Sequence, residues 1–313
     1  MPRVIDCPTE EKLELAELVE LLESGPFDSE DEDNFASWGV QLRKLANNRS
    51  FLADLMMAEL KERCAGQLKD NQYSAQVVML HARPGARVAL RANFWPALKD
   101  SVVRHSGPDP FLYGVPHDHN FSFLTVGYLG PGYWSDYYEY DYGSVVGYPG
   151  EHVNLRFVEK ARLEQGKVML YRAHKDIHLQ LPADAMSVSL NILETSHSSV
   201  FRDQYRFDLE HQTITGIMTR TSLEPLLAMT AHFGGGNGED LLRSFAAGHP
   251  SDRVRWAALK AQAAAAPGLD GRIAVLERGT RTGSALVSAM ARQEIKRLEA
   301  GRAWLSGAHL ADA

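Results

Sequence analysis

The sequence contains no run of about 18 consecutive apolar residues, so we expect no membrane-spanning helix. It has only two cysteines, Cys7 and Cys64, which are too few and too far apart for a disulfide framework or a zinc knuckle. The first residues lack the basic and then apolar pattern of a secretory signal, which predicts a cytoplasmic protein. Lys and Arg number 33 against 40 Asp and Glu, and the net charge of −7 argues against nucleic acid as a partner.

The 313 residues divide by pattern into a β-rich centre between two helical regions. Apolar residues recur at helical spacing through residues 1–73, which predicts an N-terminal helical region. Residues 74–218 carry short β-rich runs that Gly and Pro separate. These runs are 75–80, 88–94, 121–128, 153–159, 168–171, 177–181 and 186–193. The helical period returns over 219–313, so we predict three domains with these boundaries.

Many short strands separated by turns are typical of an all-β sandwich or barrel. We therefore predict an α+β protein in which a central antiparallel β-barrel is flanked by N- and C-terminal helical regions. The glycine-rich stretch 234–238 is interpreted as a flexible joint. The segment 249–259 resembles the first helix of a HEAT-type repeat, but no second copy follows it, so a small helical cap is the prediction there.

Three histidines have the spacing of metal ligands. His117 and His119 flank Asp118 directly before a β-rich run, and alternate residues of an extended segment project to the same face. His178 follows the run 168–171 and a turn, so a neighbouring strand would deliver it to the same place. Three imidazoles from two strands leave coordination positions open for water, substrate or O₂. Asp118 points the other way, and we interpret it as a hydrogen-bond anchor that orients its neighbours.

These motifs resemble the cupin superfamily, in which a His-x-His motif and a later Gly and His supply three histidine ligands. His117, His119 and His178 match those ligands, and Gly166 lies twelve residues before His178, as in the second cupin motif. The Glu ligand of the first motif would fall at Phe123 or Leu124, so it is missing from this chain. The resemblance covers residues 74–200 and implies a double-stranded β-helix barrel.

A cupin with three histidines and no Glu is most similar to the thiol dioxygenases, iron enzymes whose first motif also reads His-Asp-His. This resemblance implies a mononuclear Fe(II) site that uses O₂ on a small-molecule substrate or a peptide side chain. It also implies an arginine on an early strand that holds a substrate carboxylate, and Arg91 is the nearest counterpart. Tyr128 and Tyr171, on or near the predicted barrel strands, are predicted hydrogen-bonding groups of the catalytic site.

Two other functions stay open, because imidazole suits Fe, Zn, Cu and Ni alike. One is a redox-silent isomerase, hydrolase or lyase that uses Zn or Mn as a Lewis acid. The other is a binding protein whose barrel senses a metabolite while the helical ends dock a protein. The long helical regions suit formation of a homodimer, pocket closure or capture of a peptide substrate.

Two further features bear on the predicted site. His174 is interpreted as a loop residue, with a fourth ligand or a hydrogen-bond donor to the ligands as the alternatives. The segment 133–142 holds six aromatic and three acidic residues, which favours a β-hairpin whose aromatic side chains pack against the helical domains. The alternative is that the segment lines the mouth of the barrel and presents hydroxyls and carboxylates to a polar or cationic substrate. Glu139 within it is a candidate replacement for the missing carboxylate ligand.

Overall fold

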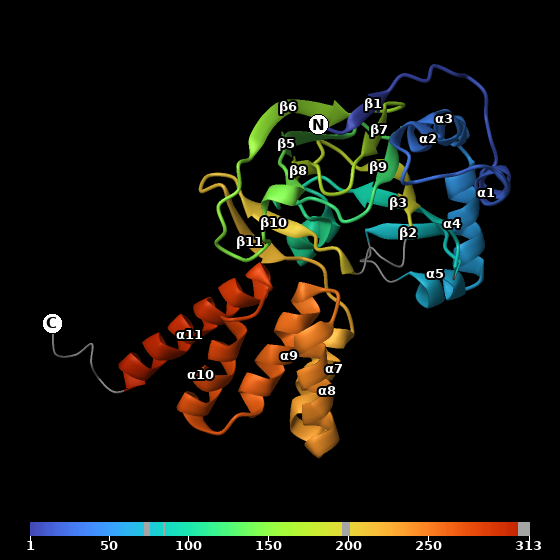
Figure 1. The fold of residues 1–313 in the computed structure, drawn as a ribbon. Helices are drawn as coiled ribbons and strands as arrows, with labels where there is room; N and C mark the ends of the chain where they lie inside the picture. Colours follow the sequence, from blue (N-terminus) through green and yellow to red (C-terminus); the bar gives the residue numbers. More distant parts are fainter. Residues whose placement is uncertain (72–75, 84, 196–200, 306–313) are drawn as a thin grey trace. The chain divides into compact units, whose positions relative to one another are not determined.

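The structure, a computed structural model, describes residues 1–71, 76–83, 85–195 and 201–305 (Figure 1). The chain divides into two units. The β unit comprises Met1–Ser144, His152–Ser199 and Gln204–Thr215, and the helical unit comprises Val145–Glu151, Val200–Asp203 and Gly216–Ala313. The division into three domains at residues 73/74 and 218/219, proposed from the sequence, stays a prediction.

Antiparallel sheets form the centre of the β unit. The six-stranded sheet has the order β1 (Arg3–Ile5), β7 (Val168–Tyr171), β4 (Phe123–Leu129), β9 (Ser187–Glu194), β3 (Val88–Trp95) and β2 (Val77–His81). A three-stranded sheet has the order β6 (Arg156–Leu163), β5 (Tyr133–Glu139) and β8 (Asp176–Gln180). A two-stranded sheet consists of β10 (Tyr205–Asp208) and β11 (Thr213–Ile217). A mixed protein with antiparallel sheets is therefore confirmed, whereas closure into a barrel stays a prediction.

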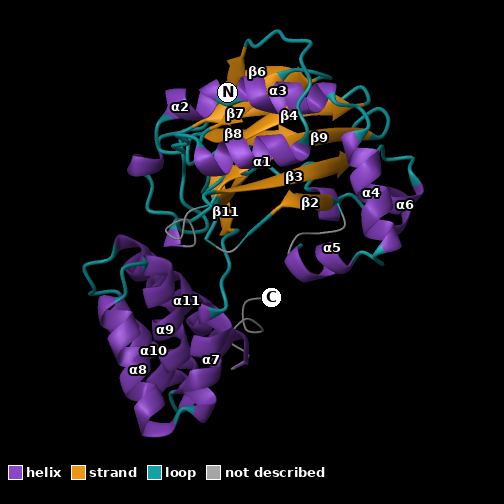
Figure 2. Ribbon diagram, turned by 90° about the vertical axis from the view of Figure 1, so that its right-hand side faces the viewer, coloured by secondary structure: helices purple, strands orange, loops and turns teal. Residues whose placement is uncertain are grey.

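Helices cover one face of the six-stranded sheet, and α1 and α3 lie across its strands in Figure 2. The helices of this unit are α1 (Leu15–Ser24), α2 (Glu32–Ser37), α3 (Gly39–Asn47), α4 (Phe51–Lys61), α5 (Ala65–Asp70) and α6 (Ser101–Ser106), with 3₁₀ turns η1 (Asp109–Phe111) and η2 (Tyr142–Ser144). Leu18 and Leu42 from the helices pack with Leu124 and Ile192 from the strands, all fully buried. Each such side chain contributes about 1.5–3 kcal/mol by leaving water, so this layer fixes the sheet in place.

The other face of the six-stranded sheet forms a second core. Since successive strand residues point to opposite faces, Phe123 faces away from the helical layer that Leu124 contacts. The ring of Trp95 in β3 lies 4.5 Å from that of Tyr133 in β5, which shows that the six-stranded and three-stranded sheets face each other. Gly130 and Gly132, with φ of +79° and +78°, form the turn by which the chain crosses from one sheet to the other.

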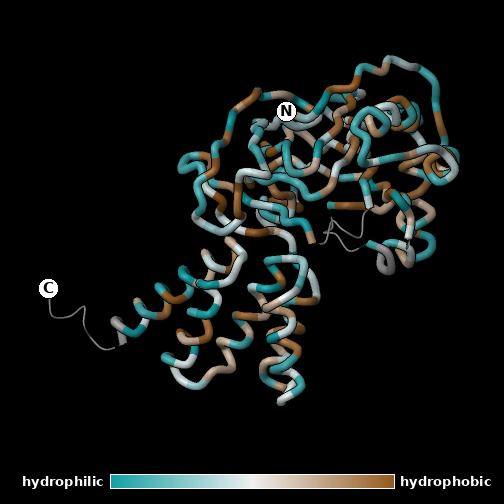
Figure 3. The backbone as a smooth tube through the Cα atoms, viewed as in Figure 1, coloured by the Kyte–Doolittle hydropathy of each residue, from teal (hydrophilic) through white to brown (hydrophobic). Residues whose placement is uncertain are grey.

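The helical unit consists of helices packed around α9. They are α7 (Leu223–Phe233), α8 (Gly235–Gly248), α9 (Asp252–Ala265), α10 (Gly268–Gly279) and α11 (Ala285–Leu305). Apolar side chains of α9 pack with α7 and α8 on one side and with α10 and α11 on the other. In Figure 3 hydrophobic and hydrophilic segments alternate along α11, as expected for an amphipathic helix. Among the described residues, no helix is long and apolar enough to cross a membrane.

The flexible joint predicted at 234–238 is wrong, because these glycines belong to the tight corner between α7 and α8 and to the first turn of α8. A Cβ atom on Gly234 would lie 2.6 Å from the carbonyl oxygen of Thr230. The glycines therefore allow a close approach of two helices, and the packing of α8 outweighs their low helix propensity.

Candidate metal centre

The three predicted metal ligands meet between the sheets of the β unit. The segment before β4 pairs with β8 through reciprocal backbone hydrogen bonds, 3.2 Å from His117 N to His178 O and 3.0 Å from His178 N to His117 O. This pairing places the side chains of His117, His119 and His178 next to one another, with only 1%, 8% and 3% of each residue exposed. Nε2 of His178 lies 3.1 Å from Nε2 of His117 and 3.1 Å from Nε2 of His119.

Burial keeps these imidazoles neutral, which is the form that binds a metal. Burial lowers the pKa of His117 and holds the pKa values of His119 and His178 well below the usual range, and neighbouring imidazoles lower the latter two further. Nδ1 of His117 lies 2.8 Å from the carbonyl oxygen of Val115. A carbonyl accepts only from a protonated nitrogen, so Nδ1 carries the hydrogen and Nε2 presents a lone pair to the other histidines.

The arrangement fits a divalent transition metal. With metal–nitrogen bonds of about 2.0–2.1 Å, nitrogens 3.1 Å apart subtend roughly 95–100° at a shared ion. This angle lies between the octahedral and tetrahedral values, so it suits Fe and Zn alike. The ligand atoms of the three histidines all lie within 4.8 Å of one another. Within the part of the chain that the structure describes, the cluster with this geometry contains these histidines and no carboxylate.

Asp118 is the hydrogen-bond anchor that the sequence predicts. Its side chain is fully buried and accepts from the hydroxyl of Tyr140 at 2.6 Å and from the backbone N–H of Tyr205 at 2.6 Å. Both partners lie far from it in the sequence. Because Asp118 stands between His117 and His119, these bonds fix the segment that carries both ligands.

His174 supports the same segment from a turn, as the loop interpretation predicts. Its backbone N–H donates to the carbonyl oxygen of His119 at 2.8 Å, and its φ is 58°. The ring lies 3.9 Å from that of Tyr142, with Nδ1 3.8 Å from Asp118 Oδ2. The imidazole therefore packs on the Asp118 side of the segment.

Glu139 belongs to an ion network beside the turn. Its carboxylate pairs with Arg172 at 3.1 Å, with the amino group of Met1 at 2.6 Å and with Arg156. Burial raises the pKa of Glu139, but the hydrogen bond from Met1 and the positive charges outweigh that effect and lower it to about 2. Arg172 also binds Asp176, the first residue of β8, at 2.7 Å. The network thus fixes the turn that leads to His178.

The structure brings Tyr171 to the histidines and separates Tyr128 from them. The ring of Tyr171 lies 5.1 Å from that of His178, and its hydroxyl lies 2.9 Å from the hydroxyl of Tyr137. Tyr128 points into the helical layer, where its hydroxyl donates to the carbonyl oxygen of Arg49 at 2.9 Å. The interpretation of Tyr128 as a site residue is therefore not supported by its position, because it shares the outer face of β4 with Leu124.

Arg91 lies on the inner face of β3, which is the face that also carries Trp95 and points towards the three-stranded sheet, and it is 8% exposed. After burial and the neighbouring imidazoles, its positive charge is a further cause that lowers the pKa of His119. Asn191 is its partner in the β3–β9 register and is also the partner of Thr125 across β9 and β4. This register places a cation and two uncharged polar side chains in one row across the inner face.

Sequence reasoning missed the polar residues of this inner face. The side-chain oxygens of Asn93, Thr125 and Asn191 are buried and have no hydrogen-bond partner among the described residues, and the hydroxyl of Ser135 is buried beside that of Tyr137. Ser135 lies on β5 in the facing sheet, opposite Gln180. A signal was present, because in β9 polar residues alternate with apolar ones although both faces are buried. Buried polar atoms normally have hydrogen-bond partners, so these oxygens require water, an ion or a polar ligand as partners.

Comparisons with known proteins place this chain in no family. No family model matches it, and no curated protein matches it. Solved structures with distant similarity include a hydroquinone 1,2-dioxygenase (11% identity, 41% of this chain and 68% of that one, TM-score 0.24). Others are a salicylate 1,2-dioxygenase from Pseudaminobacter salicylatoxidans (10% identity, 45% and 33%, TM-score 0.25) and a DMSP lyase from Ruegeria pomeroyi (15% identity, 63% and 78%, TM-score 0.24).

The chain spans about a third of the salicylate dioxygenase and about two thirds of the hydroquinone dioxygenase. At these TM-scores the likeness decides neither fold nor activity, so the functional interpretation rests on the residues of this chain. The structures named above give no support to the HEAT-type resemblance of segment 249–259, which stays a prediction.

Proposed function

We propose that the β unit is a cupin-type mononuclear iron oxygenase that acts with O₂ on a small polar substrate. His117, His119 and His178 would hold Fe(II). The observation that carries this proposal is the convergence of three buried, neutral imidazoles, in which Nε2 of His178 lies 3.1 Å from Nε2 of each of the other two. When bound, the ion would supply open coordination positions and electrons for the reaction between O₂ and substrate.

The residues around the histidines are suited to restricting water at the site. The rings of Phe121 and Phe123 lie 5.1 Å and 4.9 Å from that of His119. Tyr171 stacks on Phe123 with ring centres 4.5 Å apart and completes this aromatic wall. An apolar wall lowers the local dielectric constant and strengthens the electrostatic contacts that orient a charged substrate.

Tyr171 and Tyr137 would act as neutral hydrogen-bonding groups. Burial raises the pKa of Tyr137 to about 12 and holds that of Tyr171 well above the usual range. Both hydroxyls therefore keep their protons at neutral pH. One proton serves the bond between the two oxygens, and the second hydroxyl hydrogen would go to Ser135, a neighbour of Tyr137, or to a substrate.

The inner face of the six-stranded sheet supports a substrate with an anionic group and several polar atoms. Arg91 supplies a cation for a carboxylate. Asn191 and Thr125 lie beside it in the register of the sheet, and their side-chain oxygens are buried without a hydrogen-bond partner among the described residues. The burial of all three histidines favours a small molecule over a peptide side chain as the substrate. Arg91 is thus a substrate-binding residue in this proposal.

O₂ uptake by iron-loaded protein tests the proposal. Anaerobically purified chain is loaded with Fe(II) and screened with thiols, amino-acid derivatives and other small carboxylates in an oxygen electrode. We expect substrate-dependent uptake that His178→Ala abolishes, that Arg91→Gln weakens through KM, and that Tyr128→Phe leaves unchanged. Uptake by the His178→Ala variant at the wild-type rate would refute the proposal.

A redox-silent enzyme is the second candidate, because three imidazoles also suit Zn²⁺. Such an enzyme would be an isomerase, hydrolase or lyase, and it would turn over a substrate under argon. Turnover without O₂ by zinc- or manganese-loaded protein would therefore favour this candidate. Turnover of either kind excludes a pure sensor.

A further inference from the structure

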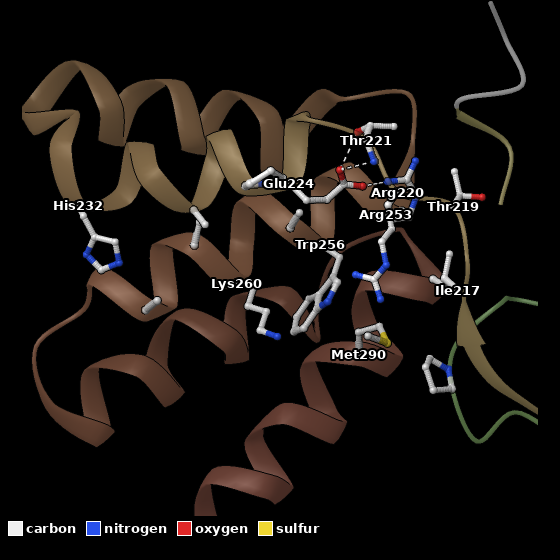
Figure 4. Close-up of a pocket in the computed structure, with 16 residues that line it drawn as sticks. Ile217, Thr219, Arg220, Thr221, Glu224, His232, Arg253, Trp256, Lys260 and Met290 are labelled. Atoms are coloured by element: carbon white, nitrogen blue, oxygen red, sulfur yellow. Dashed lines mark hydrogen bonds and ion pairs between the residues drawn. The ribbon is translucent and has the colours of Figure 1, made fainter. Parts of the chain in front are cut away.

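The helical unit contains a groove of about 770 Å³ along one face of α9 (Figure 4). Its floor is formed by Arg253, Trp256, Ala257, Lys260, Ala261 and Ala264. These positions follow the helical repeat of three and four and therefore form one face of the helix. α7 and Met290 of α11 form the sides. The volume falls within the range of about 300–1,000 Å³ that is usual for small-molecule sites.

One end of the groove is polar, and its charges are largely paired. Arg253, with 6% of its side chain exposed, bonds Asp203 at 2.7 Å and also pairs with Glu224. Glu224 accepts from the backbone N–H of Thr221 at 3.1 Å and from its hydroxyl at 2.6 Å. The carboxylate of Glu224 is thus already paired with Arg253 and hydrogen-bonded to Thr221. Arg220 lies at the same end in Figure 4.

Apart from Lys260 and His232, the rest of the groove is apolar. The indole of Trp256 lines it beside Met290, and Ala257, Ala261 and Ala264 continue the floor with side chains too small to fill it. The floor from Arg253 to Ala264 is about 16 Å long, from a rise of about 1.5 Å per residue. A long apolar channel with a polar end suits an elongated ligand that is itself polar at one end.

The charge that remains at the groove is positive. Among the described residues, neither Arg220 nor Lys260 forms an ion pair with a carboxylate, whereas Glu224 is neutralised as above. Lys260 lies near Glu294, whose pKa is lowered first by a hydrogen bond from Arg297 and only lastly by the charge of Lys260. Two cations therefore face an apolar groove, which attracts an anionic group.

We propose that this groove binds an amphiphilic carboxylate, such as a medium-chain fatty acid. The carboxylate would pair with Arg220 at the polar end, because a guanidinium matches a carboxylate in two hydrogen bonds. The alkyl chain would lie over Trp256 and the alanine floor, with Lys260 adding positive charge at the side. The inference concerns the helical unit alone and does not depend on the metal centre.

Decanoate binding to the full chain, followed by calorimetry and by Trp fluorescence below the critical micelle concentration, tests the proposal. We expect saturable binding, weakened at least about tenfold by Arg220→Gln. Ala264 is exposed, so Ala264→Leu should fill the groove without disturbing the core and should also weaken binding. The matched control is Arg272→Gln, an exposed arginine of α10 outside the groove, which should bind like wild type.

Decanol and Trp256→Phe separate the parts of the proposal. Decanol, which lacks the charge, should bind about as weakly as decanoate binds Arg220→Gln. Trp256→Phe should keep the calorimetric binding and lose the fluorescence change. Decanoate and decanol binding equally well, or no decanoate binding by wild type, would overturn the proposal. A fall in oligomer mass on Ala264→Leu in light scattering would also overturn it, because it would assign the groove to a second copy of the chain.

Discussion

Removal of one hydroxyl group, in Tyr140→Phe, tests how the metal-binding segment is held. The Tyr140 hydroxyl donates at 2.6 Å to Asp118, a fully buried carboxylate between the two ligands of one segment. A hydrogen bond to a charged group contributes about 1.5–3 kcal/mol. Nδ1 of His174 lies 3.8 Å from the same carboxylate oxygen, which is too far to replace the bond. We therefore expect the free energy of unfolding to fall by about 2 kcal/mol or more in Tyr140→Phe.

Calorimetry of the full chain checks this value, since about 2 kcal/mol lowers the melting temperature of a unit of this size by roughly 4–8 °C. The matched control is Tyr138→Phe, the neighbouring β5 tyrosine whose ring packs on Phe157, and it should shift stability by less than about 0.5 kcal/mol. Metal affinity should fall about 10- to 100-fold in Tyr140→Phe, as when other outer contacts of metal ligands are lost. Unchanged stability and affinity would refute the role given to Asp118.

Three further predictions address other parts of the β unit. Because the pKa of Glu139 is lowered to about 2 from an ordinary 4.5, its contribution to stability is complete above pH 4.5 and is lost as the pH falls towards 2. Urea midpoints measured across that window should therefore depend less on pH in Glu139→Gln than in wild type, and equal slopes would contradict the ion network. Tyr128→Phe should lose about 0.5–1.5 kcal/mol of stability in urea unfolding while keeping its metal content, because its hydroxyl bonds only the helical layer. Thr125→Val should raise stability by about 1 kcal/mol and raise KM, because the buried hydroxyl lacks a partner; a loss of stability would show that the hydroxyl is paired.

The metal-binding histidines could be predicted because their signal is local. The His-x-His spacing needs only an extended segment, and His178 needs only the strand and turn before it. The strand predicted over 168–171 matches β7, and the one over 186–193 matches β9 within a residue at each end. Such runs are predictable because strand propensity and turn residues act over a few positions.

Features that depend on distant contacts could not be predicted. β4 is buried on both faces, so its sequence does not reveal that Phe123 faces the site and Tyr128 the helices. The partners of Asp118 come from elements far along the chain. The glycines at 234–238 are open to interpretation as a flexible joint, because nothing in the local sequence shows their close approach to Thr230. That approach arises only when α7 and α8 pack together.

Metal content of anaerobically purified protein, measured by elemental mass spectrometry, tests the central claim most directly. We predict close to one iron per wild-type chain and its loss in His178→Ala. The control His211→Ala, an exposed histidine paired with Asp208, should keep the metal. Far-UV circular dichroism of each variant confirms that the fold is intact. Metal retained by a folded His178→Ala, or a wild-type chain that binds no metal even after reconstitution, would contradict the three-histidine site.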